Sequence, residues 1–321
     1  MSKANPKISV IIPVFDEDKY VKEAIDSVLS QSYDAFELII VDDGSTDNTR
    51  KVLDKYTDPR IKIFYRDNGG QCAARNYGIR ESSGEYIKFL DADDIINPEH
   101  LMSQYEAIKD SPGCVASCKW AYFVDSLKDV KFDVETTHKD YEDPVDWIYD
   151  SITYDKGTMG GWMWLIPRKI LEKTGYWNEQ LSLDDDFEFS IRVLLASSGV
   201  RFAPGAKLYY RKGNITSMSG TFSREALESA YLTTSLGRDH LLEREDSSRM
   251  RKLLADRFQG WVFKMYPENK DLSDKCEEAV KELGGSHKKA AGGVLFKILN
   301  SFLPWKLIRK MQVFAYKYGW G

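Results

Sequence analysis

The stretch Ile8-Ser-Val-Ile-Ile-Pro-Val-Phe15 is a nearly unbroken run of apolar and β-branched residues close to the start of a 321-residue chain. Strands with one face in water alternate apolar and polar residues, whereas strands buried on both faces read as continuous apolar runs. The stretch therefore predicts an inner strand of a parallel sheet.

The segments that follow alternate between strand and helix patterns. Further strands are predicted at residues 36–41, 61–65 and 85–90, and helices at 20–29, at the segment that Thr46 or Asp47 can cap, and at 69–79. Four strands alternating with helices are typical of the βαβ units of a doubly wound α/β sheet.

The rest of the chain divides at about residue 222. Before it we predict helices at 98–109, 168–174 and 185–196, and strands at 115–124, 163–166, 200–202 and 206–211. The pattern between residues 125 and 154 is weak, which indicates an insertion or a lid. Beyond residue 223 all predicted elements are helices, two of them around Pro304. We therefore expect an α/β domain over 1–222 and a helical region over 223–321.

The composition is that of a soluble globular protein, because 42% of the residues are hydrophobic and 13% aromatic, which excludes disorder. The four cysteines form no CxxC pair, and the N-terminus lacks the pattern of a signal peptide. The longest apolar segment, 290–305, is interrupted by Lys297, Asn300 and Pro304, so it is too polar to span a membrane. We expect reduced thiols and a cytoplasmic location.

Acidic residues follow the predicted strands, at the edge where open parallel sheets bind their ligands. Asp91-x-Asp93 supplies hard oxygen ligands that suit Mg²⁺ or Mn²⁺ shared with substrate phosphates, although alone it could be a capped, solvated turn. Asp42-Asp43-Gly44-Ser45 is either a turn or a place where a carboxylate accepts a hydrogen bond from a nucleobase. Arg75, after Gly69-Gly70, is either a phosphate ligand or a surface residue at the start of a helix.

Together these segments resemble the inverting glycosyltransferases of family 2, which have a GT-A fold. The matching segments, in the family's order over most of residues 7–192, are Ser9–Phe15, Ile39–Asp47, Ala74–Asn76, Gly84–Asp94 and Asp185-Asp186. The resemblance implies a Rossmann-like, mostly parallel sheet flanked by helices. It also implies a nucleotide-sugar half over about 1–124 and an acceptor half over about 125–222.

The resemblance implies roles for the matching positions. Asp43 corresponds to the carboxylate that reads the base, Asp91 to the one that meets the ribose, and Asp93 to the ligand of Mg²⁺ or Mn²⁺. The other positions expected at the donor nucleotide are Pro13, Phe15, Asp16 and Arg75. Departures are Asp16, where the family often has Asn, and the absence of the His often found near Tyr210–Gly213.

The catalytic base is expected among three consecutive aspartates. Asp186 matches the second residue of the family's Glu-Asp motif, with Arg192 six residues later, and Asp185 is the neighbouring candidate. An acidic residue here also caps a helix, so one aspartate can cap while another takes the proton of an acceptor hydroxyl. Trp162, Met163 and Trp164 form either an aromatic wall for the acceptor sugar or part of the core.

The charge is segregated. Residues 283–321 carry seven basic and no acidic side chains, so with a net charge of −5 overall the rest of the chain is at −12. In 305–318 the basic residues lie on one helical face, opposite Leu307, Ile308, Met311 and Phe314. This pattern indicates a helix on an anionic membrane surface, or one that packs on protein. The acidic remainder argues against nucleic-acid binding.

The sequence therefore predicts a metal-dependent, inverting glycosyltransferase of hexosyl or N-acetylhexosaminyl type. It would move one sugar from a nucleoside-diphosphate donor, most simply a UDP-sugar, to a hydroxyl of a glycan or lipid-linked acceptor in cell-surface polysaccharide synthesis. The Gln-x-x-Arg-Trp motif of processive synthases is absent, which favours single-sugar transfer. The alternative is a catalytically weak nucleotide-sugar-binding scaffold at the inner membrane face. A Rossmann dehydrogenase is excluded, because Pro13-Val-Phe-Asp-Glu stands where that fold needs Gly-x-Gly-x-x-Gly.

Overall fold

Strand β1 (Ile8–Val14) is buried along its whole length in the computed structural model, as is β2 (Phe36–Asp42). The structure describes residues 7–155, 157–213, 223–290, 299 and 302–317. Its contacts divide the chain into two compact units, Met1–Thr221 and Phe222–Gly321.

Within the described residues the first unit is built on an eight-stranded mixed sheet with the order β3-β2-β1-β4-β7-β6-β8-β5. The remaining strands are β3 (Ile61–Tyr65), β4 (Tyr86–Phe89), β5 (Ile95–Ile96), β6 (Val115–Phe123), β7 (Leu165–Pro167) and β8 (Val200–Arg211). Strands β1 to β4 pair in parallel, and β7 joins β4 to β6 by antiparallel pairing. The predicted doubly wound half is thus confirmed, and β7 extends it into a second half.

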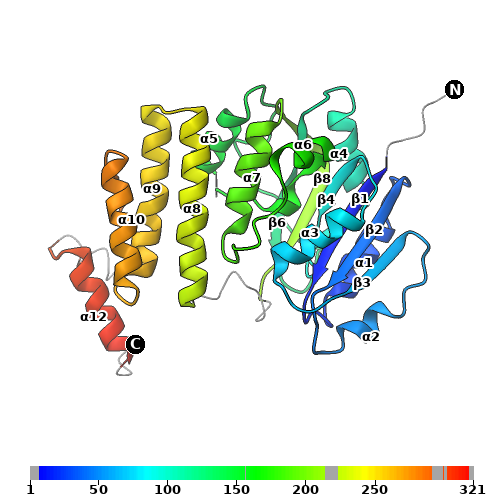
Figure 1. The fold of residues 1–321 in the computed structure, drawn as a ribbon, viewed down its shortest axis with the longest axis horizontal. Coiled ribbons are helices and arrows are strands. Elements are labelled where there is room, and N and C mark those ends of the chain that lie inside the picture. The colour runs from blue at the N-terminus through cyan, green and yellow to red at the C-terminus, as the bar shows by residue number, and fades with distance from the viewer. Residues whose placement is uncertain (1–6, 156, 214–222, 291–298, 300–301, 318–321) are drawn as a thin grey trace. The chain divides into compact units, whose positions relative to one another are not determined.

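Helices cover this sheet, as Figure 1 shows for α3 beside β1 and β2. The helices of the first unit are α1 (Val21–Leu29), α2 (Thr49–Leu53), α3 (Gln71–Glu81), α4 (His100–Ile108), α5 (Pro144–Tyr154), α6 (Arg168–Thr174), α7 (Asp185–Ala196) and the short 3₁₀ helix η1 (Gly161–Met163). Helix α4 packs on β6 and β8, and α6 packs on α7.

One local prediction is wrong, and one segment left open by the sequence contains a helix. The strands expected at 200–202 and 206–211 are one strand, β8, whose pairing with β6 shifts register between Cys118 and Lys119. Residues 125–154, where the sequence indicated an insertion or a lid, include helix α5 at their end. Asp143 caps α5 by accepting a hydrogen bond from the Val145 amide, and Pro144 occupies the first turn.

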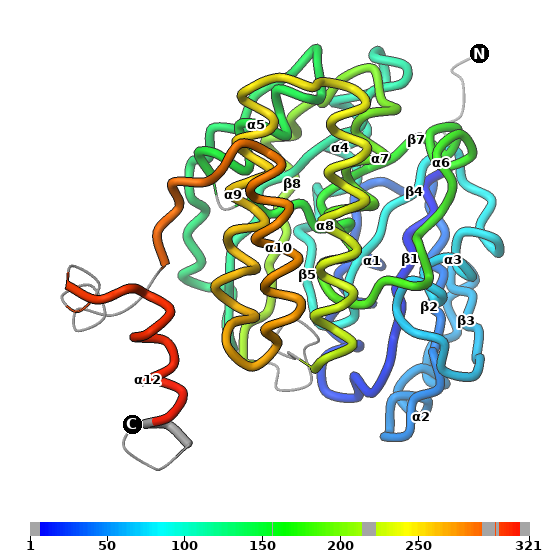
Figure 2. The backbone as a smooth tube through the Cα atoms, turned by 60° about the vertical axis from the view of Figure 1, so that its left-hand side comes forward, coloured from blue at the N-terminus to red at the C-terminus, as the bar shows by residue number. Residues whose placement is uncertain are grey.

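The second unit contains α8 (Arg224–Arg244), α9 (Ser248–Met265), α10 (Lys270–Glu282) and α12 (Trp305–Lys317). Figure 2 shows α8, α9 and α10 lying side by side, with α9 in contact with both others. The helix expected before Pro304 falls largely on residues outside those described. No helix of the described chain combines the length and apolarity that crossing a bilayer requires.

The sheet places the acidic turns together. In the parallel register Val14 pairs with Asp42, and Ile11 pairs with both Ile39 and Phe89. The chain therefore leaves β1, β2 and β4 at the same edge. That edge is where the candidate site lies.

Candidate active site

The turns after β1 and β2 are tied to each other by Asp16. Its backbone has a positive φ of 52°, which aspartate tolerates better than most residues. The Asp16 carboxylate accepts a hydrogen bond of 2.6 Å from the Thr46 amide, and its own amide donates to Ser45 Oγ at 3.0 Å. Pro13 is buried, whereas Phe15 is 46% exposed beside this turn. Asp16 thus holds the turn that presents Phe15.

Asp43 follows β2 and is almost completely buried, at 3% exposure. Its carboxylate accepts hydrogen bonds from the amides of Gly69 (3.1 Å) and Gly70 (2.7 Å) and pairs with Arg66 Nη1 at 3.1 Å. Gly70 has a φ of 89°, a conformation that glycine adopts without strain. The turn before α3 therefore orients Asp43, and its role in reading a base stays a prediction.

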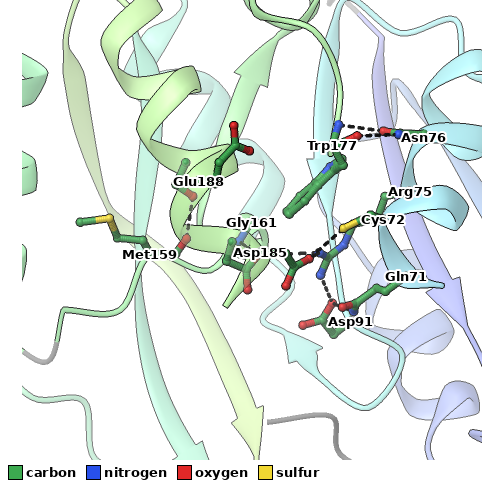
Figure 3. Close-up of polar contacts among 12 residues, drawn as sticks. Gln71, Cys72, Arg75, Asn76, Asp91, Met159, Gly161, Trp177, Asp185 and Glu188 are labelled. Atoms are coloured by element: carbon green, nitrogen blue, oxygen red, sulfur yellow. Dashed lines mark hydrogen bonds and ion pairs between the residues drawn. The ribbon is translucent and has the colours of Figure 1, made fainter. Parts of the chain in front are cut away.

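Arg75 of α3 is a fully buried cation that connects the two halves of the first unit (Figure 3). Nη2 lies 2.9 Å from Asp91 Oδ1 after β4, and Nη1 lies 3.1 Å from Asp185 Oδ2 on α7. The guanidinium also stacks over the Trp177 ring, 4.1 Å from its centroid. The alternative of a surface residue is therefore wrong, whereas a place for Arg75 at the donor nucleotide stays a prediction. Nη1 and Nη2 bond carboxylates, and Nε has no hydrogen-bond partner among the described residues.

The turn after β4 carries three aspartates with different surroundings. Asp91 Oδ1 accepts from Arg75 and, at 3.2 Å, from Gln71 Nε2. Asp93 is half-buried, whereas Asp94 is buried and accepts from the Arg211 amide at 2.9 Å. Burial, reinforced by the charges of Asp93 and Asp91, raises the pKa of Asp94 well above its usual value. Asp94 therefore has a structural position, and Asp91 and Asp93 line the edge.

A divalent cation at Asp93 stays a prediction from the sequence. Mg²⁺ and Mn²⁺ are held in many enzymes by one or two carboxylates together with substrate phosphates, and Asp93 offers such an oxygen ligand. Among the described residues, no group of three or more His, Cys, Asp and Glu side chains is placed to hold a metal ion. A cation at Asp93 would complete its coordination with substrate oxygens and water.

Helix α7 begins at Asp185, after Asp184 in a left-handed conformation with a φ of 64°. Asp185 is buried and accepts hydrogen bonds from Arg75 Nη1 and from Cys72 Sγ, both at 3.1 Å. Burial raises the pKa of Asp185, and Arg75 opposes that shift. Both carboxylate contacts come from α3, so Asp185 serves the packing of α7 against α3.

Asp186 keeps a side chain that is 33% exposed, unlike its neighbour. Its Oδ1 accepts a hydrogen bond of 2.7 Å from the Gly161 amide and lies 3.7 Å from Arg75 Nη1. Burial raises the pKa of Asp186 to about 7; Arg75 lowers it, and the charges of Asp185 and Asp91 raise it. A carboxylate that titrates near neutral pH and reaches solvent has the properties of a general base.

The acceptor wall expected from Trp162, Met163 and Trp164 is wrong. Their exposures are 2%, 3% and 0%, so no face is left for a sugar. Trp164 Nε1 donates to Ser190 Oγ at 3.1 Å, and Trp162 packs edge-on against Trp120. These residues form the core beneath the site.

Two residues at the end of β8, for which we predicted no role from the sequence, lie beside the acidic turn. Arg211 donates through Nε to the Asp93 carbonyl at 2.8 Å and pairs with Glu23 at 2.7 Å, so it fixes the acidic turn. The Tyr210 ring lies 5.7 Å from that of the exposed Tyr122. Burial raises the pKa of Tyr210, helped by the surrounding acids Asp91, Asp94, Asp93 and Asp186. The sequence signal that could have identified them is an aromatic residue followed by a basic one at the end of the last predicted strand.

Sequence comparison identifies relatives. Residues 9–175 match the profile described as "Glycosyl transferase family 2". The chain is 31% identical over 196 residues to an uncharacterized glycosyltransferase of Rickettsia typhi, covering 60% of each protein. It spans 31% of the length of two further Rickettsia relatives. It is 27% identical over 291 residues to glycosyltransferase GlyG of Streptococcus pneumoniae, covering 84% of this chain and 93% of that one.

Structure comparison agrees. The crystal structure of S. aureus TarS residues 1–349 aligns with a TM-score of 0.67 at 21% identity, covering 86% of this chain and 80% of that one. The same fragment in complex with UDP-GlcNAc aligns with a TM-score of 0.62 at 20% identity, covering 88% and 93%. The mixed sheet with its parallel half and flanking helices is therefore the GT-A fold, and the chain belongs to glycosyltransferase family 2.

Proposed function

We propose that the protein transfers one sugar from a nucleoside-diphosphate sugar to a hydroxyl group of a glycan or lipid-linked acceptor, with inversion at the anomeric carbon. The observation that carries the proposal is Asp186, a partly exposed carboxylate whose pKa is raised to about 7, beside the acidic strand ends. A nucleoside-diphosphate donor is supported by the strand-end acids, and a UDP-sugar by the TarS complex with UDP-GlcNAc.

In this mechanism Asp186 accepts the proton of the acceptor hydroxyl while that oxygen attacks the anomeric carbon. A single displacement, with the base and the leaving diphosphate on opposite sides of the sugar, inverts the anomeric configuration. Asp43 would bind the base and Asp91 the ribose, at a rim formed by Pro13, Phe15 and Asp16. Mg²⁺ or Mn²⁺ at Asp93 would neutralise charge on the diphosphate. Arg75 would hold Asp91 and Asp185 in register.

The donor and the metal can be identified together. Release of nucleoside diphosphate is measured with UDP-, GDP- and dTDP-sugars, each with Mn²⁺, with Mg²⁺ and with EDTA. We expect turnover with a UDP-sugar that requires the metal. Saturable binding of a sugar nucleotide without turnover, in the presence of candidate acceptors, would favour the alternative of a binding scaffold.

We also propose a peripheral location on the inner face of the membrane, through α12. Within the second unit Ile308 is buried, Trp305 packs on Phe263 with 4.8 Å between ring centroids, and Lys306 pairs with Glu277. A neighbouring strip of the helix surface exposes an apolar row: Leu307 (46%), Met311 (51%) and Phe314 (65%). The helix is thus anchored by one side and presents hydrophobic residues on this neighbouring strip, with Lys310 exposed beside them.

This arrangement supports a lipid surface as the partner of α12. Of the apolar residues expected to share one face, Ile308 is buried, whereas Leu307, Met311 and Phe314 are exposed. An apolar row next to basic residues suits the boundary between headgroups and acyl chains of an anionic membrane. A lipid-linked acceptor would be met at the same surface.

A further inference from the structure

The turn at residues 159–163 contains the Gly161 amide that donates a hydrogen bond to Asp186, and most of its backbone carbonyls accept hydrogen bonds. The Met159 carbonyl accepts from Ser190 Oγ at 2.6 Å, and the Gly160 carbonyl accepts from the Met163 amide at 2.9 Å. The Trp162 carbonyl accepts from Lys88 Nζ at 2.5 Å. Figure 3 shows Met159 and Gly161 on this turn, across from Asp185 at the start of α7. The Gly161 amide, between these anchors, points at Asp186 Oδ1.

Lys88 is the unusual member of this set. It lies on the inner strand β4 at 0% exposure, and burial lowers the pKa of its ammonium to about 8. Removing a charged amine from water is costly, and a Met of similar length would fit an apolar strand without that cost. The hydrogen bond that the structure describes for its side chain is the one to the Trp162 carbonyl. A second buried side chain, Gln104 of α4, donates to the next carbonyl, that of Met163, at 2.9 Å.

Gly161 itself has no room for a side chain. A Cβ there would lie 2.5 Å from the Trp177 ring and 3.1 Å from Asp186 Oδ1. Trp177 is held in turn by stacking on Phe189, with ring centroids 3.7 Å apart. The hydrogen bonds to the neighbouring carbonyls and the stacked Trp177 ring thus hold the Gly161 amide where it approaches Asp186.

We propose that Lys88 is a positioning residue for Asp186. By holding the Trp162 carbonyl, it keeps η1 in the one position where the Gly161 amide donates to the Asp186 carboxylate. That hydrogen bond stabilises the ionised form and orients the oxygen. The role of Asp186 as the base rests on the proposed function, whereas the link from Lys88 to Asp186 does not.

The charged and titratable groups around Asp186 come from four elements, and Lys88 touches none of them. They are Arg75 and Cys72 on α3, Asp91 after β4, Asp185 on α7 and Tyr210 on β8. A change at Lys88 therefore reaches Asp186 through the position of the Gly161 amide.

The test is a titration of Asp186 by NMR of the full chain labelled with ¹³C at the aspartate carboxyls. The Asp186 signal is assigned by its loss in Asp186→Asn. In Lys88→Met we expect the midpoint of this signal to move upward by about one pH unit, because the carboxylate loses an amide donor. An unchanged midpoint in folded Lys88→Met overturns the proposal.

Matched variants separate positioning from general loss of stability. Gln104→Met removes the hydrogen bond to the Met163 carbonyl and should shift the Asp186 midpoint in the same direction. If Lys88→Met does not fold, Gln104→Met is the variant that tests the proposal. Gln31→Met removes an equally buried donor, which bonds the Ser27 and Asn97 carbonyls at 2.9 and 2.7 Å, and should leave the midpoint unchanged. A shift of equal size in Gln31→Met would also overturn the proposal.

Turnover with UDP-GlcNAc, where the protein accepts it, adds a second readout. We expect Lys88→Met to lower kcat about tenfold or more and to move the acid limb of the pH profile upward, with UDP affinity within about twofold of wild type. If Asp186→Asn retains turnover, the proposed function fails, while the titration still decides the role of Lys88.

Discussion

At the scale of single residues, Asp185 and Asp186 are neighbours with opposite environments. Asp185 is buried against Arg75 and Cys72, whereas one third of the Asp186 side chain meets solvent. The sequence favoured Asp186 because Arg192 follows it by six residues, but three consecutive aspartates left the register uncertain by one residue. The start of α7 makes the distinction by turning one carboxylate toward α3 and the other toward Gly161.

The raised pKa of Asp186 predicts a dependence of stability on pH. Its folded value of about 7 lies above the ordinary value of 3.8, so this group's contribution to stability is lost as pH rises through 7. Asp186→Asn removes this partly buried charge, and we expect Tm to rise by about 1–3 °C at pH 8 and by less at pH 5, where the loss is only partial. An equal change at both pH values would contradict the assigned ionisation.

Asp93 gives a prediction about the metal. Replacing it with Ala removes an oxygen ligand, so in Mn²⁺ we expect UDP to bind about tenfold more weakly or worse, a loss of about 1.4 kcal/mol. In EDTA the variant and wild type should bind UDP alike. Calorimetry that finds identical affinities in Mn²⁺ would remove Asp93 from the metal site.

Among the helices and strands, Arg75 joins α3 to the turn after β4 through Asp91 and to α7 through Asp185. Arg75→Met would leave Asp91 and Asp185 without their buried counter-charge, so we expect a loss of about 3–5 kcal/mol in urea unfolding at pH 8. The loss should shrink at lower pH, where the carboxyls take up protons. A variant as stable as wild type at pH 8 would show that these ion pairs contribute nothing net.

Some strands could be predicted from the sequence, and others could not. The buried runs of β1 and β2 predicted the inner strands, because their pattern is local. The continuity of β8 was missed, since its irregular residues are satisfied by distant ones: the Gly205 amide donates to Ser103 Oγ, and its carbonyl accepts from Asn97. The partners of Arg75 were equally hidden, as Asp185 lies 110 residues away. Pairing over such distances leaves no periodic signal.

In the whole molecule, residues 283–321 carry a net positive charge and the remainder a net negative charge. We expect Leu307→Ser/Met311→Ser/Phe314→Ser to reduce sedimentation with vesicles of phosphatidylglycerol and phosphatidylcholine by about tenfold. Val134→Ser and Tyr154→Ser, at exposed apolar positions of the first unit, serve as controls and should not change it. Undiminished sedimentation of the triple variant would assign α12 to another role.

If Asp186 takes the proton of the acceptor hydroxyl, its loss slows turnover without weakening donor binding. Turnover of Asp186→Asn is compared with wild type, using the sugar nucleotide that the donor screen selects, alongside calorimetry with UDP. We predict a fall in kcat of about 10²–10⁴-fold with UDP affinity within about twofold, as expected for loss of a general base. Unchanged turnover would contradict the account and move the base away from Asp186.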